Sequence, residues 1–184
     1  MKPQEFLDKY GDAFVVACEG TRIFPSVKIA QAALETGWGK SVVGNNLFGI
    51  KATGNTNQYW HGDYVTAATT EVDGNGQLVP TTGKFRKYLT VSDSIMDHNR
   101  LILTNSRYAG VLTASTPEQQ AQALQAARYA GKNNTKYAGR LIDIINTYNL
   151  KKYDQKKKIM KWIDITIAVL AILSACWIIY KATR

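Results

Sequence analysis

The strongest constraint on this chain is an uncharged stretch near its C-terminus. Residues 165–180 contain no charged side chain, and extending the stretch back to residue 162 adds only Asp164. As a helix, residues 162–180 would measure about 28 Å, which is close to the hydrocarbon thickness of a bilayer. The stretch therefore predicts one transmembrane helix. A buried helix is the alternative, but such a helix rarely lacks a polar face over so many residues.

Aromatic and basic residues flank this stretch. Trp162 lies at one end, and Trp177 and Tyr180 lie at the other, as expected for rings at two membrane interfaces. We expect the basic residues 151–161 to be a linker and residues 181–184 to be a short tail. The first 150 residues are enough for one globular domain and too few for two.

The net charge of +9 belongs mostly to the C-terminal part. Of the 23 Lys and Arg residues, eight lie beyond residue 150, together with only two of the 14 acidic residues. The basic residues of the domain are dispersed and match no nucleic-acid motif, so the sequence predicts no nucleic-acid partner. The N-terminus is charged and lacks the apolar core of a secretory signal, so the sequence indicates no export route.

Several common types of site are excluded by residue spacing. Cys18 and Cys176 lie too far apart in the chain to suggest a disulfide framework, and His61 and His98 do not have metal-ligand spacing. The chain contains neither a Gly-x-Ser-x-Gly elbow nor a phosphate-binding Gly-rich loop. We therefore expect no metal or other cofactor. Of the common types of catalytic site, hydrolysis by carboxylate side chains is the one that the sequence still allows.

The apolar spacing predicts a mainly helical domain with one β excursion. Strand-forming residues dominate 58–89, with a turn signal at 73–76, and predict a small hairpin lobe. Thr116 is expected to cap one helix, and Gly37 to end another. The expected helices run from Pro3 to near Gly20 and over 26–35, 92–103, 117–129 and 137–148.

Glu35 is the best candidate for a catalytic group. It follows an apolar helical run and precedes Trp38. A helix C-terminus and an apolar neighbour both disfavour the charged carboxylate. A carboxyl group that keeps its proton near neutral pH is what a general acid for a glycosidic oxygen requires.

Four blocks of sequence, in matching order over about residues 5–149, resemble glycoside hydrolase family 73, the glucosaminidases that include bacterial autolysins and the flagellar peptidoglycan hydrolase. The blocks are ALETGWGKS at 33–41, NNLFGIK at 45–51, FRKY at 85–88, and Tyr-Ala pairs at 129–130 and 137–138. The resemblance implies a lysozyme-like fold, the α+β class of a helical domain with a small β-hairpin lobe. It also implies cleavage of the β-1,4 glycan backbone of peptidoglycan as an endo-β-N-acetylglucosaminidase, with Glu35 at the position of the general acid.

The resemblance also implies a second catalytic group. The family places another carboxylate on the hairpin lobe, which by position is Glu71, with Asp73 as a competitor that is also a natural turn residue. The N-acetyl group of the substrate is an alternative nucleophile. Tyr129 and Tyr137 match two family tyrosines, but the segment between them is two residues longer here and lacks the family's Asp-Pro, so packing is an equal alternative for both.

Aromatic residues near these motifs are candidates for contacts with sugar faces. We expect substrate-binding roles for a set that comprises Trp38, Asn46, Phe48, Tyr59, Trp60 and Tyr64. Ordinary core packing is the alternative for the aromatic members, above all for Trp38.

The lysines before the uncharged stretch predict the orientation in a membrane. Six of them precede it and two basic residues follow it, which by the positive-inside rule holds the domain on the cytoplasmic side of a bacterial inner membrane. That side suits a virus that takes its internal membrane from the host. We therefore predict an enzyme of a phage virion, used in wall penetration or lysis and adjacent to capsid proteins. The functional alternatives are a lytic transglycosylase and a non-catalytic, membrane-anchored module that binds peptidoglycan strands.

Overall fold

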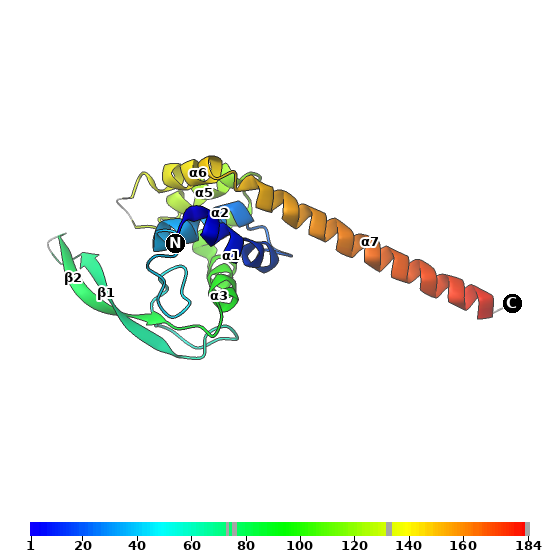
Figure 1. Ribbon diagram of the computed structural model, residues 1–184, viewed down its shortest axis with the longest axis horizontal. Helices are drawn as coiled ribbons and strands as arrows, with labels where there is room; N and C mark the ends of the chain where they lie inside the picture. Colours follow the sequence, from blue (N-terminus) through cyan, green and yellow to red (C-terminus); the bar gives the residue numbers. More distant parts are fainter. Residues whose placement is uncertain (73, 75–76, 132–133, 183–184) are drawn as a thin grey trace.

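The structure is a computed structural model that describes residues 1–72, 74, 77–131 and 134–182. It consists of a helical body, a β-hairpin arm that curves along one side of the body, and a long helix that projects away from it (Figure 1). This arrangement confirms the predicted fold class, a mainly helical domain with a small two-stranded sheet and one long apolar C-terminal helix.

The helical body is built around α2 (Pro25–Thr36), of which ten of the twelve residues are buried. The helices packed around it are amphipathic and bury their apolar faces in one continuous core. They are α1 (Pro3–Ala17), α3 (Val91–Thr104), α5 (Pro117–Ala126) and α6 (Tyr137–Thr147). Two short elements that the sequence did not predict, the 3₁₀ turn η1 (Ser106–Tyr108) and α4 (Ala109–Leu112), bury Tyr108 and Val111 against this core.

The helix boundaries follow the predicted signals. The hydroxyl of Thr116 accepts a hydrogen bond from the backbone N–H of Gln119, as the predicted N-cap of α5. Gly37 ends α2 in the left-handed conformation at φ 56°. The helix expected over 117–129 is shorter, because Arg128 adopts φ 56° and the chain turns there.

The hairpin arm consists of β1 (Tyr64–Val72) and β2 (Leu78–Arg86), which pair antiparallel from Tyr64 opposite Arg86 to Val72 opposite Leu78. The predicted hairpin is therefore present. Of its predicted turn, residues 73, 75 and 76 lie outside the described part of the chain.

A buried ion pair anchors the base of the arm to the helical body. Arg86, the last residue of β2, contacts Asp97 of α3 at 2.6 Å, and both side chains are almost fully buried. Asp97 also accepts hydrogen bonds from the Tyr88 hydroxyl at 2.8 Å and from the Asn57 amide at 2.9 Å. A buried charge is tolerated when it is paired and hydrogen-bonded in this way, so the network fixes the arm against α3.

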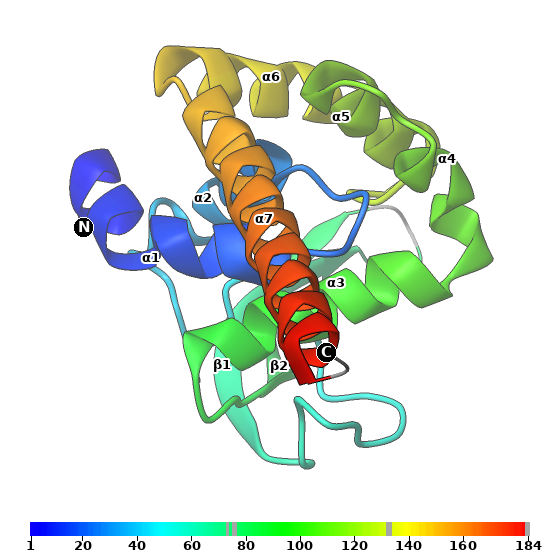
Figure 2. The same ribbon diagram turned by 90° about the vertical axis from the view of Figure 1, so that its right-hand side faces the viewer.

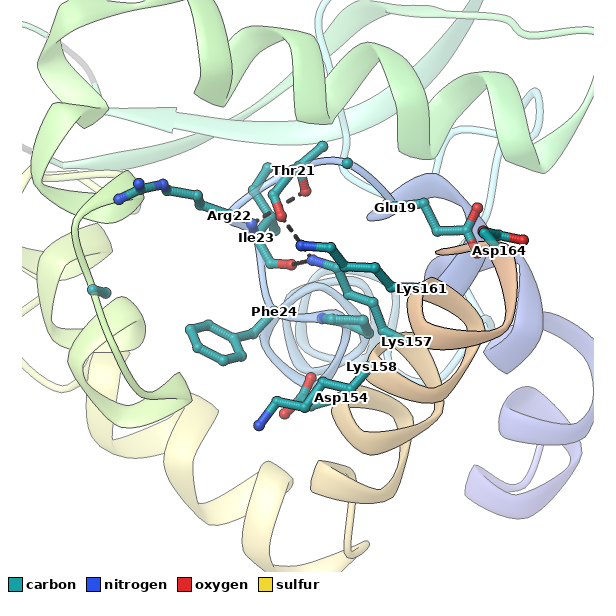
Figure 3. A pocket seen from close by; sticks show the side chains of 13 residues that line it. Glu19, Thr21, Arg22, Ile23, Phe24, Asp154, Lys157, Lys158, Lys161 and Asp164 are labelled. Atoms are coloured by element: carbon teal, nitrogen blue, oxygen red, sulfur yellow. Dashed lines mark hydrogen bonds between the residues drawn. The ribbon is translucent and has the colours of Figure 1, made fainter. Parts of the chain in front are cut away.

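The long helix α7 (Lys151–Ala182) begins as part of the domain. Residues 151–161, expected to be a linker, are helical, and Tyr153 is buried in the core next to Gly11 of α1. The Asp154 carboxylate accepts a hydrogen bond from the backbone N–H of Ser26 at 2.9 Å. The Lys157 ammonium donates to the backbone carbonyls of residues 21 and 23 (Figure 3). These contacts join the first turns of α7 to α1 and to the start of α2.

Beyond residue 161, α7 leaves the body and projects outward without a break (Figures 1 and 2). Its apolar side chains are exposed there, including Ile167, Leu170 and Trp177. By length and composition α7 is able to cross a membrane, and none of its most apolar stretch is buried within the structure.

The contact between Gly11 and Tyr153 makes Gly11→Ala a test of how α7 docks. An added Cβ would lie 2.6–2.8 Å from atoms of the Tyr153 side chain, so either this side chain or the two helices, α1 and α7, would have to shift. We expect a loss of about 1–3 kcal/mol in unfolding free energy, the usual cost of overpacking. Gly139→Ala in α6 is the matched control, because nothing lies within 4 Å of its added Cβ; it is expected to stabilise by about 0.4–1 kcal/mol. Thermal unfolding of the full chain in detergent measures both, and equal shifts in melting temperature would contradict the packing.

Candidate active site

Glu35 lies in the last turn of α2, at the point where the chain leaves the core. The helix closes there with two features of a left-handed cap: Gly37 at positive φ, and a hydrogen bond from the Trp38 N–H to the Ala33 carbonyl at 2.9 Å. The preceding turns of α2 are buried, whereas Glu35 itself is exposed. The sequence pattern of an apolar run, Glu and then Gly therefore places one carboxyl group at the edge of the core.

Glu35 opens into a cavity of about 390 Å³. It is formed by two parts of the chain that are far apart in the sequence: the end of α2 with the loop after it, and the connection from α5 into α6 with the first turn of α6. Its remaining lining residues are Leu34, Phe48, Tyr129, Ala130, Asn134, Tyr137 and Arg140. The carboxyl group therefore reaches solvent through a walled cavity.

Although Glu35 is exposed on one side, the cavity walls remove part of its hydration and so raise its pKa, and the positive charge of Arg140 opposes this effect. The raised pKa agrees with the property expected from the sequence, but part of the physical reason differs. The apolar neighbours in the cavity are Phe48, Tyr129 and Tyr137, whereas Trp38 is not among the lining residues. A carboxyl group with a raised pKa, open to a cavity, can donate a proton to a bound molecule.

Tyr129 and Tyr137 meet in this cavity, with ring centroids 5.6 Å apart. The backbone cap after α5 positions Tyr129, because Arg128 is left-handed and the Tyr129 N–H bonds to the carbonyl of Leu124 at 3.0 Å. The Tyr129 hydroxyl lies 2.7 Å from His98 Nε2. The Tyr137 hydroxyl accepts a hydrogen bond from the Gln31 amide at 3.1 Å. Burial raises the pKa of both phenols, so both stay protonated.

Phe48 and Asn46 have different places in the site. Phe48 lines the cavity, and its ring stacks on that of His98 with centroids 3.9 Å apart. Asn46 is buried, and its amide donates to the carbonyls of Ile50 and Arg86 at 2.9 and 3.0 Å. Asn46 therefore shapes the loop that presents Phe48 and is not itself a lining residue.

Trp38 is oriented toward the core. Its ring contacts Phe6 and Tyr148, with centroid distances of 5.7 and 4.4 Å. This packing is the alternative that the sequence favoured for Trp38 over a contact with sugar.

The three aromatic residues predicted near the hairpin lie outside the cavity. Trp60 is buried, and its indole N–H donates to the Asp63 carbonyl at 2.6 Å. Tyr59 lines a separate hollow next to α3. Tyr64 is half-exposed on β1, under the ammonium of Lys84. The structure brings none of these rings to Glu35.

Of the two candidates for the second carboxylate, the structure describes the backbone position of Glu71. Glu71 is in β1, opposite Val79 of β2. Asp73 lies outside the described residues. The arm curves along the side of the body that carries the connection between α5 and α6 (Figure 1).

Four residues near the cavity were missed in the sequence: Lys28, Gln31, His98 and Arg140. Lys28 and Gln31 precede Glu35 by seven and four positions, so all three lie on one face of α2. Arg140 follows Tyr137 by three positions in α6 and shares its face in the same way. This helical spacing was a usable signal. His98 had none, because only the packing of α3 brings it beneath Phe48.

Within the described part of the chain, no group of three or more His, Cys, Asp or Glu side chains is placed to hold a metal ion. Cys18 is free and buried, and Cys176 is free and lies on the projecting part of α7.

Known proteins with similar sequences and structures include wall-degrading enzymes. The exo-glucosaminidase LytG of Bacillus subtilis is 34% identical over 174 residues, which is 90% of this chain and 58% of that protein. The peptidoglycan hydrolase FlgJ of Escherichia coli K12 is 41% identical over 64% of this chain, and 37% of its own length is covered. The catalytic domain of the autolysin Auto from Listeria monocytogenes superposes with a TM-score of 0.69 at 34% identity, covering 83% of this chain and 87% of that one.

This chain spans about a third to three fifths of these two curated relatives. The glycoside hydrolase domain of FlgJ from Salmonella typhimurium covers 89% of this chain and 99% of its own, with a TM-score of 0.65 and 29% identity. A family model described as glucosaminidase, mannosyl-glycoprotein endo-beta-N-acetylglucosaminidase, matches residues 11–150. The chain therefore belongs to the glucosaminidase family, glycoside hydrolase family 73.

Proposed function

We propose that this protein hydrolyses peptidoglycan by cutting the β-1,4 glycan backbone, with Glu35 as the general acid. The observation that carries the proposal is the single carboxyl group at the end of α2, whose pKa is raised and which opens into a cavity lined by aromatic rings. Membership of the glucosaminidase family supports the same chemistry. The cavity places a bound sugar beside Glu35, which supplies the proton for the leaving oxygen.

The other groups have roles that follow from their positions. Tyr129 and Tyr137 are neutral hydroxyls at the cavity wall and can hydrogen-bond to the sugar at the cleaved bond. Glu71, on the hairpin arm, is our candidate for the second carboxylate, which would activate water or stabilise the positive charge on the sugar ring. Participation of the substrate's N-acetyl group is the alternative, and it would leave Glu71→Gln active.

Glu35→Gln tests the proposed acid directly. Gln is close in size and carries no transferable proton, so we expect muropeptide release from purified sacculi to fall by at least about 10²-fold with the unfolding temperature unchanged. Glu19→Gln is the matched control, because Glu19 is exposed and lines a different hollow. Undiminished release by Glu35→Gln would remove the proposal. Reducing N-acetylglucosamine ends are expected; anhydro-muramic ends would show a lytic transglycosylase, and binding without any product would show a non-catalytic module.

Arg140 tests the protonation state of Glu35. A general acid works only while protonated, so the alkaline limb of the pH profile of kcat/KM follows the pKa of Glu35. Arg140 lowers that pKa, so Arg140→Gln is expected to move the alkaline limb to higher pH. Arg140→Lys keeps the charge and is expected to leave the limb near that of the wild type. A shift to lower pH in Arg140→Gln would contradict the assignment.

The tethering of this enzyme to a lipid bilayer through residues 162–180 is part of the proposal. Support comes from α7, whose apolar side chains are exposed once it leaves the body. A hollow of about 640 Å³ lies at the base of α7, and Lys157, Lys158 and Lys161 gather there, at the level that lipid headgroups would occupy (Figure 3). Basic side chains at this level suit an anionic membrane surface.

The place of action that we propose is the internal membrane of a phage virion, with capsid proteins adjacent, where the enzyme serves wall penetration or lysis. The lysines before residue 162 support a cytoplasmic orientation of the domain, and such a membrane, taken from the host, turns that face toward the capsid. A bacterial inner membrane is the alternative location. Finding the protein only in envelopes of uninfected cells, with its domain open to protease from the periplasm, would exclude the virion.

Leu170→Arg tests the anchor. Leu170 is near the middle of residues 162–180 and exposed in the structure, so a charge there would face the bilayer centre and cost about 2.5–3.5 kcal/mol. We expect the wild type to float with lipid vesicles and resist extraction by alkaline carbonate, and Leu170→Arg to be extracted to a greater extent. Leu170→Ile is the apolar control. A wild-type chain that carbonate extracts completely would contradict the anchor.

A further inference from the structure

A buried lysine and a buried histidine lie directly beneath the cavity. Lys28 of α2 and His98 of α3 are each only 1% exposed, and Lys28 Nζ is hydrogen-bonded to His98 Nδ1. The opposite ring nitrogen, His98 Nε2, lies 2.7 Å from the hydroxyl of Tyr129, which lines the cavity together with Glu35. Three polar groups therefore form one chain from the core to the cavity wall.

The rest of the surroundings leave these groups few other partners. Phe48 stacks on the imidazole, and its ring also lies 4.5 Å from the Lys28 ammonium. Among the described residues, no carboxylate forms an ion pair with Lys28; the ionisable group that faces it from the C-cap of α1 is the thiol of Cys18, whose pKa burial raises to about 11. A buried lysine without a carboxylate is costly, which calls for an explanation beyond packing.

When Lys28 is charged, its hydrogen-bonding chemistry decides which group donates and which accepts in each of these two hydrogen bonds. An ammonium group has only donors, so a charged Lys28 requires His98 Nδ1 to accept. The imidazole must then carry its hydrogen on Nε2 and donate it to the Tyr129 oxygen. With that lone pair occupied, the hydrogen of the Tyr129 hydroxyl is directed away from His98 and is available to a molecule bound in the cavity that Tyr129 lines.

We propose that Lys28 and His98 are positioning residues that make Tyr129 a hydrogen-bond donor to an acceptor oxygen of the glycan bound next to Glu35. The inference rests on the proposed function and extends it to two residues that do not touch the substrate. A neutral Lys28 amine would allow the opposite arrangement, in which Tyr129 donates to His98 and presents only a lone pair to the cavity. The charge on Lys28 therefore determines whether the Tyr129 hydroxyl presents a hydrogen or a lone pair to the cavity.

The titration of the buried groups agrees with this arrangement. Burial, and then the charge of Lys28, lowers the pKa of His98 well below its usual value, so the imidazole is neutral. Burial lowers the pKa of Lys28 to about 7, with the Cys18 thiol opposing this shift. Burial, and then the nearby Tyr137, Glu35 and Tyr108, raise the pKa of Tyr129. Lys28 is therefore charged at mildly acidic pH.

Nitrogen-15 NMR of labelled histidine tests the tautomer without requiring turnover. The chain has two histidines, and His61 is exposed, so His61→Asn leaves the signals of His98 alone. At pH 6 we expect Nε2 to be protonated and Nδ1 to be an acceptor. In Lys28→Met, where no donor faces Nδ1, both tautomers are expected. A wild-type imidazole protonated on Nδ1 at pH 6 would overturn the proposal, even if Glu35 is catalytic.

A double-mutant cycle tests the consequence for cleavage. We expect Tyr129→Phe to lower kcat/KM on purified sacculi by about 10²-fold, as for loss of one donor to a transition state. Lys28→Met should lower kcat/KM to a smaller extent, and this loss should vanish in the Tyr129→Phe background. Equal losses from Lys28→Met in both backgrounds, or none in the wild type, would overturn the positioning role. A wild type without any turnover would instead count against the proposed function, and the NMR result would still decide the tautomer.

Discussion

The burial of α2 is the constraint on which the rest of the structure depends. Ten of its twelve residues are inside the core, so the helix has almost no freedom to rotate or slide. Every other helix packs on it directly or through a neighbour, and α7 is tied to its first turn through Asp154. Because α2 ends at a left-handed glycine, its last carboxyl group emerges at one defined point of the surface. The candidate acid is therefore positioned by a rigid element.

The same helix carries polar groups inward as well as outward. Lys28, Gln31 and Glu35 share one face, and each meets a partner from a later part of the chain: His98, Tyr137 and the charge of Arg140. Polar side chains in a core require partners, so these contacts restrict how α3 and α6 can pack. The groups that support the cavity are in this way part of what holds the body together, and the arm is held separately by Asp97.

Local patterns predicted much of this arrangement. The apolar run before Glu35 and the Gly after it predicted a helix ending at a carboxyl group with a raised pKa, and the hairpin followed from its strand-forming residues. Helix lengths were less accurate: η1 and α4 are too short to show a period, and α5 ends early because Arg128 turns the chain. The aromatic character of a residue was a poor guide to its position. Trp38 and Trp60 are aromatic like the residues that line the cavity, but both are packed elsewhere in the domain.

The sequence alone determined the class of fold, the family motifs, the candidate acid and the long apolar helix, because each follows from a pattern of residues that are close together along the chain. Only the tertiary structure decided which side chains surround that acid. Residues separated by 70 to 106 positions meet there, such as Lys28 with His98 and Gln31 with Tyr137. Their contacts depend on the relative placement of three helices, α2, α3 and α6, and such long-range packing leaves no periodic signal in one sequence.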